Sequence, residues 1–142
     1  MTAQVGERLI YRGQEHHMAA EPLRDYWALG GHNPIFEMRS TALWRGYIAT
    51  WSIIDDRLYL VGIDASCGDG REATLETLFP GYSERVFAHW FSGRVRLPQG
   101  ELIHYVHAGY GSTTEADLFL DFEDGVLIGE ELKNNRAEVQ IP

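Results

Sequence analysis

Histidines are the side chains of this sequence that could carry acid–base chemistry near neutral pH. His104 and His107 are three residues apart in a segment that reads as a β-strand. Side chains three positions apart on a regular strand point to opposite faces, so these two would not bind one metal ion together. The chain has one cysteine and no His-Glu-x-x-His motif, so we predict no metal site. Either histidine could instead act as a general acid or base.

The segment just before the strand at 45–54 is rich in residues that are typical of binding surfaces. Trp44, Arg45 and Tyr47 combine a large contact area with a polar end. They could form a recognition surface, in which Arg45 would hold an anionic group. The alternative, with equal support, is structural: Trp44 would cover the core and Arg45 would bond backbone carbonyls.

A glycine-rich segment lies at 108–115, where Gly109 and Gly111 are followed by Ser112. Glycines with this spacing can direct backbone N–H groups at an anion. The segment lacks the remaining glycine of a dinucleotide motif and the Gly-Lys-Ser/Thr of a phosphate loop. The sequence therefore favours a connection between strands, and it predicts no cofactor.

The charge of the chain is strongly acidic and unevenly distributed. The formal net charge is −9, and residues 101–142 hold nine acidic residues against two basic ones. Proteins that bind nucleic acids present a basic face to phosphates, so we expect no nucleic-acid partner. An acidic surface can attract a basic protein, although acidic surfaces also serve solubility.

The acidic residues of the C-terminal third coincide with a predicted β-hairpin at 117–128. Asp124-Gly125 is favoured at the centre of a type I′ turn. This turn places Phe122 opposite Leu127 and Asp121 opposite Ile128, with the apolar side chains on one face. Three carboxylates share the other face: Asp117, Asp121 and Glu123.

A second hairpin is predicted at 45–63, with its turn at Asp55-Asp56. In this register Trp51 faces Leu60, and Ile63 lies on the side opposite to Ala49. Both faces of the strand pair are apolar, which is typical of strands in the middle of a domain.

Two further hairpins follow from turn residues. The first spans 93–107, where Pro98 would set a type I turn and Gly100 would supply a bulge. The second spans 9–18, where Gly13 would open a type II′ turn and Arg12 would lie opposite Glu15. Helical content is expected to be small: 72–79 is the best helix, ending at Pro80, and 83–91 fits either a helical turn or a strand.

These elements predict a mainly β fold in a single domain over 1–142. We expect an antiparallel β-sandwich or a partly open barrel built from hairpins, with one or two short helices. The chain has no run of about 18 apolar residues and no secretory signal at its start, so we expect no membrane association and a bacterial-type cytoplasmic location.

Two motifs carry a resemblance to a family of small bacterial proteins without an established activity. The first is Ser40-Thr-Ala-Leu-Trp-Arg-Gly-Tyr47, and the second is Tyr105-Val-His-Ala-Gly-Tyr-Gly-Ser112. A cysteine often precedes Trp-Arg-Gly-Tyr in that pattern, and Leu43 stands there in this chain, which argues against a catalytic thiol. The resemblance implies no activity, but it directs attention to six motif positions: Trp44, Arg45, Tyr47, His107, Tyr110 and Ser112.

Two functions of different class are compatible with the sequence. The first is a protein-binding module, such as an immunity protein or antitoxin that neutralises a bacterial toxin through an acidic surface. Its contacts would include the Trp44–Tyr47 segment, Tyr110, Ser112 and the carboxylates of 117–123. The second is a small enzyme with a pocket between segments 44–47 and 104–112, where His104 or His107 is the acid or base and Arg45 holds the substrate.

Overall fold

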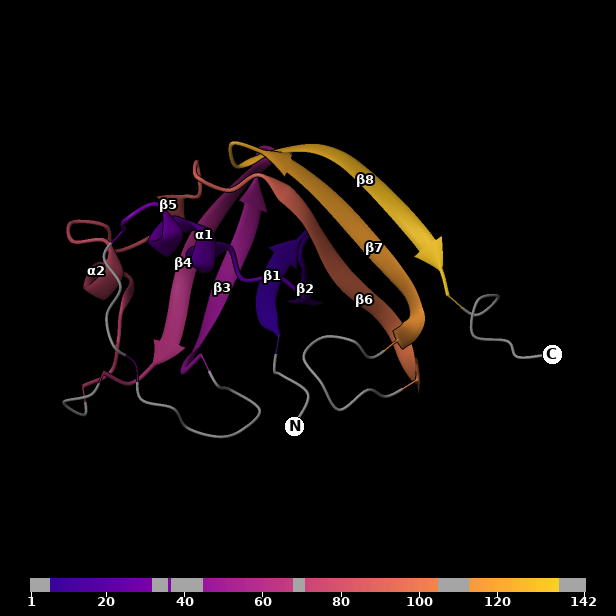
Figure 1. The fold of residues 1–142 in the computed structure, drawn as a ribbon, viewed down its shortest axis with the longest axis horizontal. Helices are drawn as coiled ribbons and strands as arrows, with labels where there is room; N and C mark the ends of the chain where they lie inside the picture. Colours follow the sequence, from indigo (N-terminus) through magenta and orange to yellow (C-terminus); the bar gives the residue numbers. More distant parts are fainter. Residues whose placement is uncertain (1–5, 32–35, 37–44, 68–70, 105–112, 136–142) are drawn as a thin grey trace.

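The computed structural model describes residues 6–31, 36, 45–67, 71–104 and 113–135, and their strands form one mixed sheet (Figure 1). Eight strands are described: β1 (Glu7–Tyr11), β2 (Gln14–Met18), β3 (Tyr47–Ile54), β4 (Arg57–Ala65), β5 (Val86–Phe87), β6 (Gly93–His104), β7 (Thr113–Glu123) and β8 (Val126–Asn134). Their order is β2-β1-β3-β4-β8-β7-β6, with β5 paired to β4. All described pairs are antiparallel except β1 with β3, which is parallel.

The sheet is bent into two halves that are joined along very little of their length. β4 and β8 pair only at Arg57 and Val126. In Figure 1 the β1–β4 half and the β6–β8 half diverge from this upper junction. The far ends come close again where the backbone N–H of Ala19 donates to the carbonyl of Arg96 at 2.8 Å, but the sheet does not close. The predicted mainly β, partly open architecture is confirmed.

The hairpin of β7 and β8 confirms the turn predicted from Asp124-Gly125. Both residues have positive φ (49° and 79°), and Phe122 lies opposite Leu127. The predicted pairing of Asp121 with Ile128 is wrong, because a bulge next to Phe122 places Asp121 opposite Gly129.

The hairpin of β3 and β4 also turns where predicted, at Asp55-Asp56, and pairs Trp51 with Leu60. A register shift beside Trp51 then moves β4 by one residue. Ile63 consequently lies opposite Ala49 and packs against the core, which corrects the prediction that it lies on the other side.

The hairpin predicted within 93–107 is wrong, because β6 is one continuous strand of 12 residues. Pro98 lies within it, opposite Asp117, and Gly100 (φ 79°) falls in an irregularity of the β6–β7 register. β6 is the last strand in the sheet order, where the missing N–H of a proline is tolerated.

The β1–β2 hairpin forms as expected, but its turn differs from the prediction. Arg12 and Gly13 both have positive φ (52° and 75°) and occupy the two central positions, so Glu15 lies opposite Ile10 and not opposite Arg12. Arg12 is held there by an ion pair with Glu130 at 3.1 Å.

Two short helices flank the β1–β4 half. α2 (Leu75–Leu78) is shorter than the predicted 72–79 and ends ahead of Pro80. α1 (Pro22–Ala28) was not predicted; it begins with a proline, whose missing N–H is not needed in a first turn. The ambiguous segment 83–91 contains the two-residue strand β5. Among the described residues, no helix combines the length and apolar character needed to cross a bilayer.

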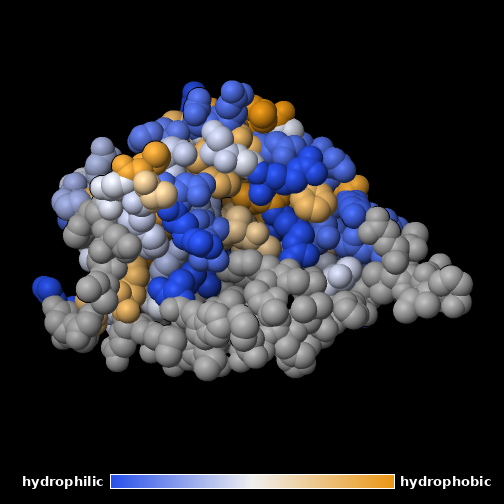
Figure 2. Space-filling model, viewed as in Figure 1, coloured by the Kyte–Doolittle hydropathy of each residue, from blue (hydrophilic) through white to orange (hydrophobic). Residues whose placement is uncertain are grey.

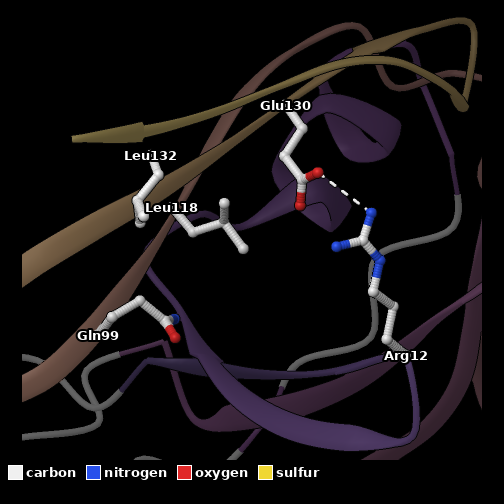
Figure 3. Close-up of a pocket in the computed structure, with 5 residues that line it drawn as sticks. All are labelled: Arg12, Gln99, Leu118, Glu130 and Leu132. Carbon is white, nitrogen blue, oxygen red and sulfur yellow. Dashed lines mark hydrogen bonds and ion pairs between the residues drawn. The ribbon is translucent and has the colours of Figure 1, made fainter.

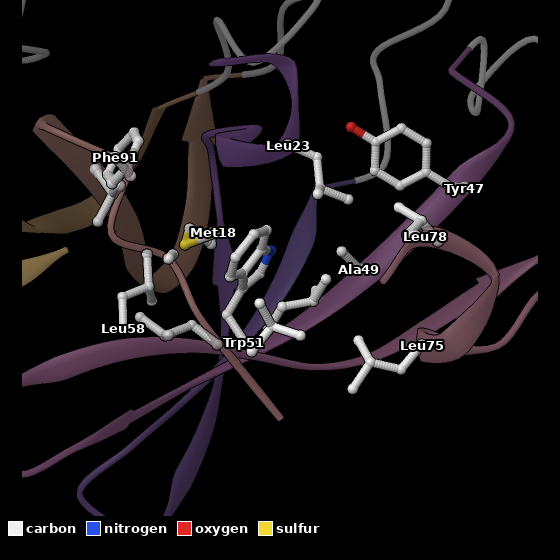
Figure 4. Close-up of a cluster of buried hydrophobic side chains, with 14 of the residues drawn as sticks. Met18, Leu23, Tyr47, Ala49, Trp51, Leu58, Leu75, Leu78 and Phe91 are labelled. Atoms are coloured by element: carbon white, nitrogen blue, oxygen red, sulfur yellow. The ribbon is translucent and has the colours of Figure 1, made fainter. Parts of the chain in front are cut away.

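The hydrophobic core lies between the two halves of the sheet and under both helices (Figure 4). Trp51 and Ala49 of β3 are fully buried, and Leu23 of α1 and Leu78 of α2 cover them. The N–H of Trp90 donates to the carbonyl of Pro22 at 2.9 Å and ties α1 to the segment that precedes β6.

Gly125 is a position where an added methyl group is expected to destabilise the fold. A Cβ there would lie 2.5 Å from the carbonyl oxygen of Ala88, in addition to the cost of a positive φ. We expect Gly125→Ala to lower the free energy of unfolding by about 2 kcal/mol. Gly13→Ala is the matched control, because Gly13 has a similar φ and open space around it; it should lose about 1 kcal/mol. Equal losses in urea denaturation would contradict the close approach at Gly125.

Candidate functional site

The predicted outer face of β7 carries its carboxylates as expected, but arginines of β6 lie among them. Arg94 donates from Nε and NH2 to the two carboxylate oxygens of Asp121, at 2.8 and 3.1 Å. These hydrogen bonds lower the pKa of Asp121 and raise that of Arg94. Arg94 also lies 3.4 Å from Glu131 of β8. The charge of Asp121 is therefore neutralised within the sheet.

Asp117 is also engaged by its neighbours. Its side chain is buried, accepts a hydrogen bond from Nδ2 of Asn135 at 2.8 Å, and lies 3.5 Å from NH1 of Arg96. The expected open row of carboxylates on β7 is thus corrected. Of its three members, Glu123 is the exposed one, and it forms no ion pair with a described residue.

The structure places an acidic group elsewhere, where the β3–β4 turn and the β7–β8 turn meet. The N–H of Leu58 donates to the carbonyl of Gly125 at 2.8 Å, and the N–H of Leu127 donates to the carbonyl of Asp56 at 2.7 Å. These bonds hold two turns together that are about 70 residues apart in the sequence. We call the four exposed carboxylates on these turns the acidic corner: Asp55, Asp56, Glu123 and Asp124.

The acidic corner differs from the outer face of β7 in whether its carboxylates form ion pairs. None of its four carboxylates forms an ion pair within the part of the chain that the structure describes. Sequence reasoning identified Glu123 but not the other three, because only the contact between the turns brings them together. Asp55, Asp56 and Asp124 all have positive φ, a conformation that favours asparagine and glycine, so the turn residues themselves are the local signal of this site.

Arg45, predicted to bind a partner or an anionic substrate, binds a carboxylate of the chain itself. Its NH2 lies 2.9 Å from Oε2 of Glu7, and its side chain is 10% exposed. Glu7 is fully buried, and its Oε2 also accepts the N–H of Ala49 at 2.7 Å. Burial raises the pKa of Glu7 to about 7, while Arg45 and the N–H of Ala49 act in the opposite direction.

Glu7 was missed by sequence reasoning, although a signal was present. β1 alternates between buried and exposed residues, and Glu7 is in phase with the buried Leu9 and Tyr11. A carboxylate at an inward position of a strand needs a cation, since an isolated buried charge is very unfavourable.

Tyr47 serves the core and not an exposed surface. It is 1% exposed and contacts the rings of Trp27 and Phe36, with centroid separations of 5.4 and 5.7 Å. The guanidinium of Arg45 lies 5.2 Å from the centre of its ring. Arg45 and Tyr47 are therefore close together, as the sequence suggested, but they stabilise the interior.

The remaining predicted site residues are not brought together by the described structure. Trp44, His107, Tyr110 and Ser112 lie outside the described residues, and so does most of the expected enzyme pocket. His104 is the last residue of β6, and its backbone is opposite Thr113. In the described part of the chain, no group of three or more His, Cys, Asp or Glu residues is placed to hold a metal ion.

A pocket of about 400 Å³ opens on the inner face of the β6–β8 half (Figure 3). Gln99, Leu118 and Leu132 line it from the sheet, and the Arg12–Glu130 ion pair lies at one side. The hydroxyl of Tyr11 also donates to Glu130, at 3.4 Å, and burial together with this carboxylate raises the pKa of Tyr11. The pocket contains none of the predicted site residues.

A second depression, of about 450 Å³, lies beside α1 and is lined by Arg24, Asp25 and Arg94 among others. Arg94 is already paired with Asp121, and the depression likewise contains none of the predicted site residues.

Comparison with protein-family models, with curated proteins and with solved structures found no match for this chain. The resemblance drawn from the two sequence motifs therefore stays a prediction, and the function has to be inferred from the molecule alone.

Proposed function

We propose that this protein is a protein-binding module that recognises a basic protein partner through the acidic corner. One observation supports the proposal above the others: two turns from distant parts of the chain are joined by backbone hydrogen bonds, and all four of their acidic side chains face solvent without an ion pair to a described residue. On β7, by contrast, Asp117 and Asp121 are matched by arginines.

Clustered carboxylates favour binding to a cationic surface for two physical reasons. Their fields add, which raises the rate at which a basic partner is captured, and the net charge of −9 adds to this attraction at long range. The backbone of the two turns also loses little conformational freedom on binding, because the turns are already fixed by hydrogen bonds to each other.

An immunity protein or antitoxin is the specific form of this proposal. A toxin that acts on nucleic acid has a basic cleft, and a small acidic module can neutralise it by occupying that cleft. The partner would then be a basic enzyme, and binding would inhibit its activity.

A charge-neutral variant of the acidic corner tests the proposal. The variant carries Asp55→Asn, Asp56→Asn, Glu123→Gln and Asp124→Asn; asparagine is well tolerated at positive φ, so the turns should persist. A partner is first captured from a lysate of the source organism with the wild-type protein. Stopped-flow mixing then measures association at several salt concentrations. We expect the variant to associate roughly tenfold more slowly and to lose most of the salt dependence.

A control variant of equal net charge separates local from global electrostatics. It neutralises four exposed glutamates that lie elsewhere (Glu15, Glu72, Glu76 and Glu84). The control should bind nearly as fast as the wild type. If both variants slow association equally, the corner has no special role. If the wild type captures no basic protein, the proposed function is wrong.

A further inference from the structure

The outer edge of β8 is a second surface of this fold, and over most of its length it pairs with no strand in the part of the chain that the structure describes. β8 pairs with β7 from Val126 to Asn134, but it pairs with β4 only at Val126. Beyond Leu127 no described strand pairs with the outer edge of β8. Ile128 and Leu132 are 62% and 68% exposed. In Figure 2 hydrophobic patches interrupt the hydrophilic surface along the rim that β8 occupies in Figure 1.

The charges along this edge have a self-complementary order. Leu132 is paired with Leu118 on the inner face, and it lies between Glu131 and Lys133, which are on the outer face. The side chain of Glu131 is 59% exposed, although Arg94 is 3.4 Å away, so Glu131 remains accessible to a further cation.

We propose that the edge of β8 binds a second copy of this chain, with the two β8 strands antiparallel about a two-fold axis at Leu132. In this register Leu132 lies opposite its own copy, and Glu131 of each chain lies opposite Lys133 of the other. Directly opposite residues of an antiparallel pair share a face, so the contact consists of one leucine pair inside and two ion pairs outside. The two sheets become one continuous sheet.

The neighbouring two-fold registers at Glu130 and Glu131 are disfavoured by charge. An axis at either residue would place its carboxylate directly against its own copy. Like charges directly opposite each other destabilise a strand pair. Only an axis near Leu132 converts the charges of β8 into attractive pairs while it keeps the exposed leucine covered.

Charged side chains on an edge strand usually prevent association with other strands. They do so because a random partner strand sets apolar or like-charged side chains against them, whereas a second copy in this register sets opposite charges against each other. The contact is also separate from the acidic corner, which lies at the opposite end of β8, next to Val126. A dimer would therefore leave both corners accessible.

Reversing the charges of Glu131 and Lys133, first singly and then together, tests this contact. Glu131→Lys should place two lysines opposite each other at both ends of the contact, and Lys133→Glu should place two glutamates there. We expect each variant to dimerise roughly tenfold more weakly than the wild type in sedimentation equilibrium. An equimolar mixture of the two variants should form a heterodimer of near wild-type strength, because each introduced charge meets its opposite. The double variant Glu131→Lys/Lys133→Glu should dimerise for the same reason.

A control variant and amide hydrogen exchange show whether any change in dimerisation comes from the edge of β8. Glu76→Lys changes the net charge by the same amount on α2, far along the chain from β8, and should leave dimerisation unchanged. Circular dichroism confirms that each variant is folded, and amide hydrogen exchange of 130–134 should slow as the wild-type concentration rises. A wild type that is monomeric at every soluble concentration overturns the proposal. So does a dimer that both single variants form as strongly as the wild type.

Discussion

Replacing Arg45 with methionine is expected to lower the free energy of unfolding by about 3–5 kcal/mol at pH 8. The substitution removes the cation that lies 2.9 Å from Glu7 and leaves a fully buried carboxylate without its counter-charge. Among the described residues, the N–H of Ala49 then remains as the one donor to Glu7, and a single donor is insufficient for an anion in an apolar interior. Urea denaturation followed by fluorescence of the four tryptophans measures the loss.

The double variant Glu7→Gln/Arg45→Met separates the ion pair from simple loss of packing. Glutamine keeps an acceptor for the N–H of Ala49, and neither variant side chain is charged. We expect the double variant to regain much of the lost stability, since removing both charges of a buried pair is far less costly than removing one. A double variant that is as unstable as Arg45→Met alone would show that Arg45 acts through packing and not through Glu7.

The second expected result is a loss of stability of about 3 kcal/mol as the pH rises from about 4.5 to about 7, attributable to Glu7. In the unfolded chain this carboxyl group releases its proton near pH 4.5, whereas burial in the folded chain raises its pKa to about 7. Between these values the unfolded state loses a proton that the folded state retains, so increasing pH favours unfolding. Below pH 4.5 the contribution is fully present, and above pH 7 it is lost.

Glu7→Gln isolates this contribution from the other titrating groups. Glutamine has nearly the same shape and does not titrate, so the difference in unfolding free energy between wild type and variant should change across pH 4.5–7 and be constant above it. Parallel pH profiles would mean that Glu7 ionises at an ordinary pKa. Arg45→Met should raise the pKa of Glu7 further, so its destabilising effect should be smaller at pH 5 than at pH 8.

Local turn chemistry was enough to identify three of the hairpins. Asp124-Gly125 and Asp55-Asp56 occupy turns with positive φ as predicted, because asparagine, aspartate and glycine tolerate that backbone region. Alternation of apolar residues then placed Trp51 opposite Leu60 and Phe122 opposite Leu127. These features depend on a few neighbouring residues, so they are readable without the fold.

Local signals failed where they are ambiguous or where distant strands meet. Pro98 and Gly100 are as compatible with a bulge inside a strand as with a turn, and the long pairing of β6 with β7 decided for the bulge. The parallel pairing of β1 with β3 leaves no local trace, because the partners are about 40 residues apart. The bulges beside Trp51 and Phe122 shift the register beyond each turn, and the turn residues alone do not indicate them.

In the candidate site, too, some features follow from the sequence and others depend on contacts between distant segments. The sequence by itself determined the acidic character of the chain, its mainly β nature, and the face on which Asp117, Asp121 and Glu123 lie. Only the tertiary structure decided which charges remain available: it set Arg94 and Arg96 against the aspartates of β7, buried Arg45 on Glu7, and joined two turns into an acidic corner. The net charge of a chain is a sum over residues, whereas the field at a surface depends on which opposite charges the fold brings within a few ångströms.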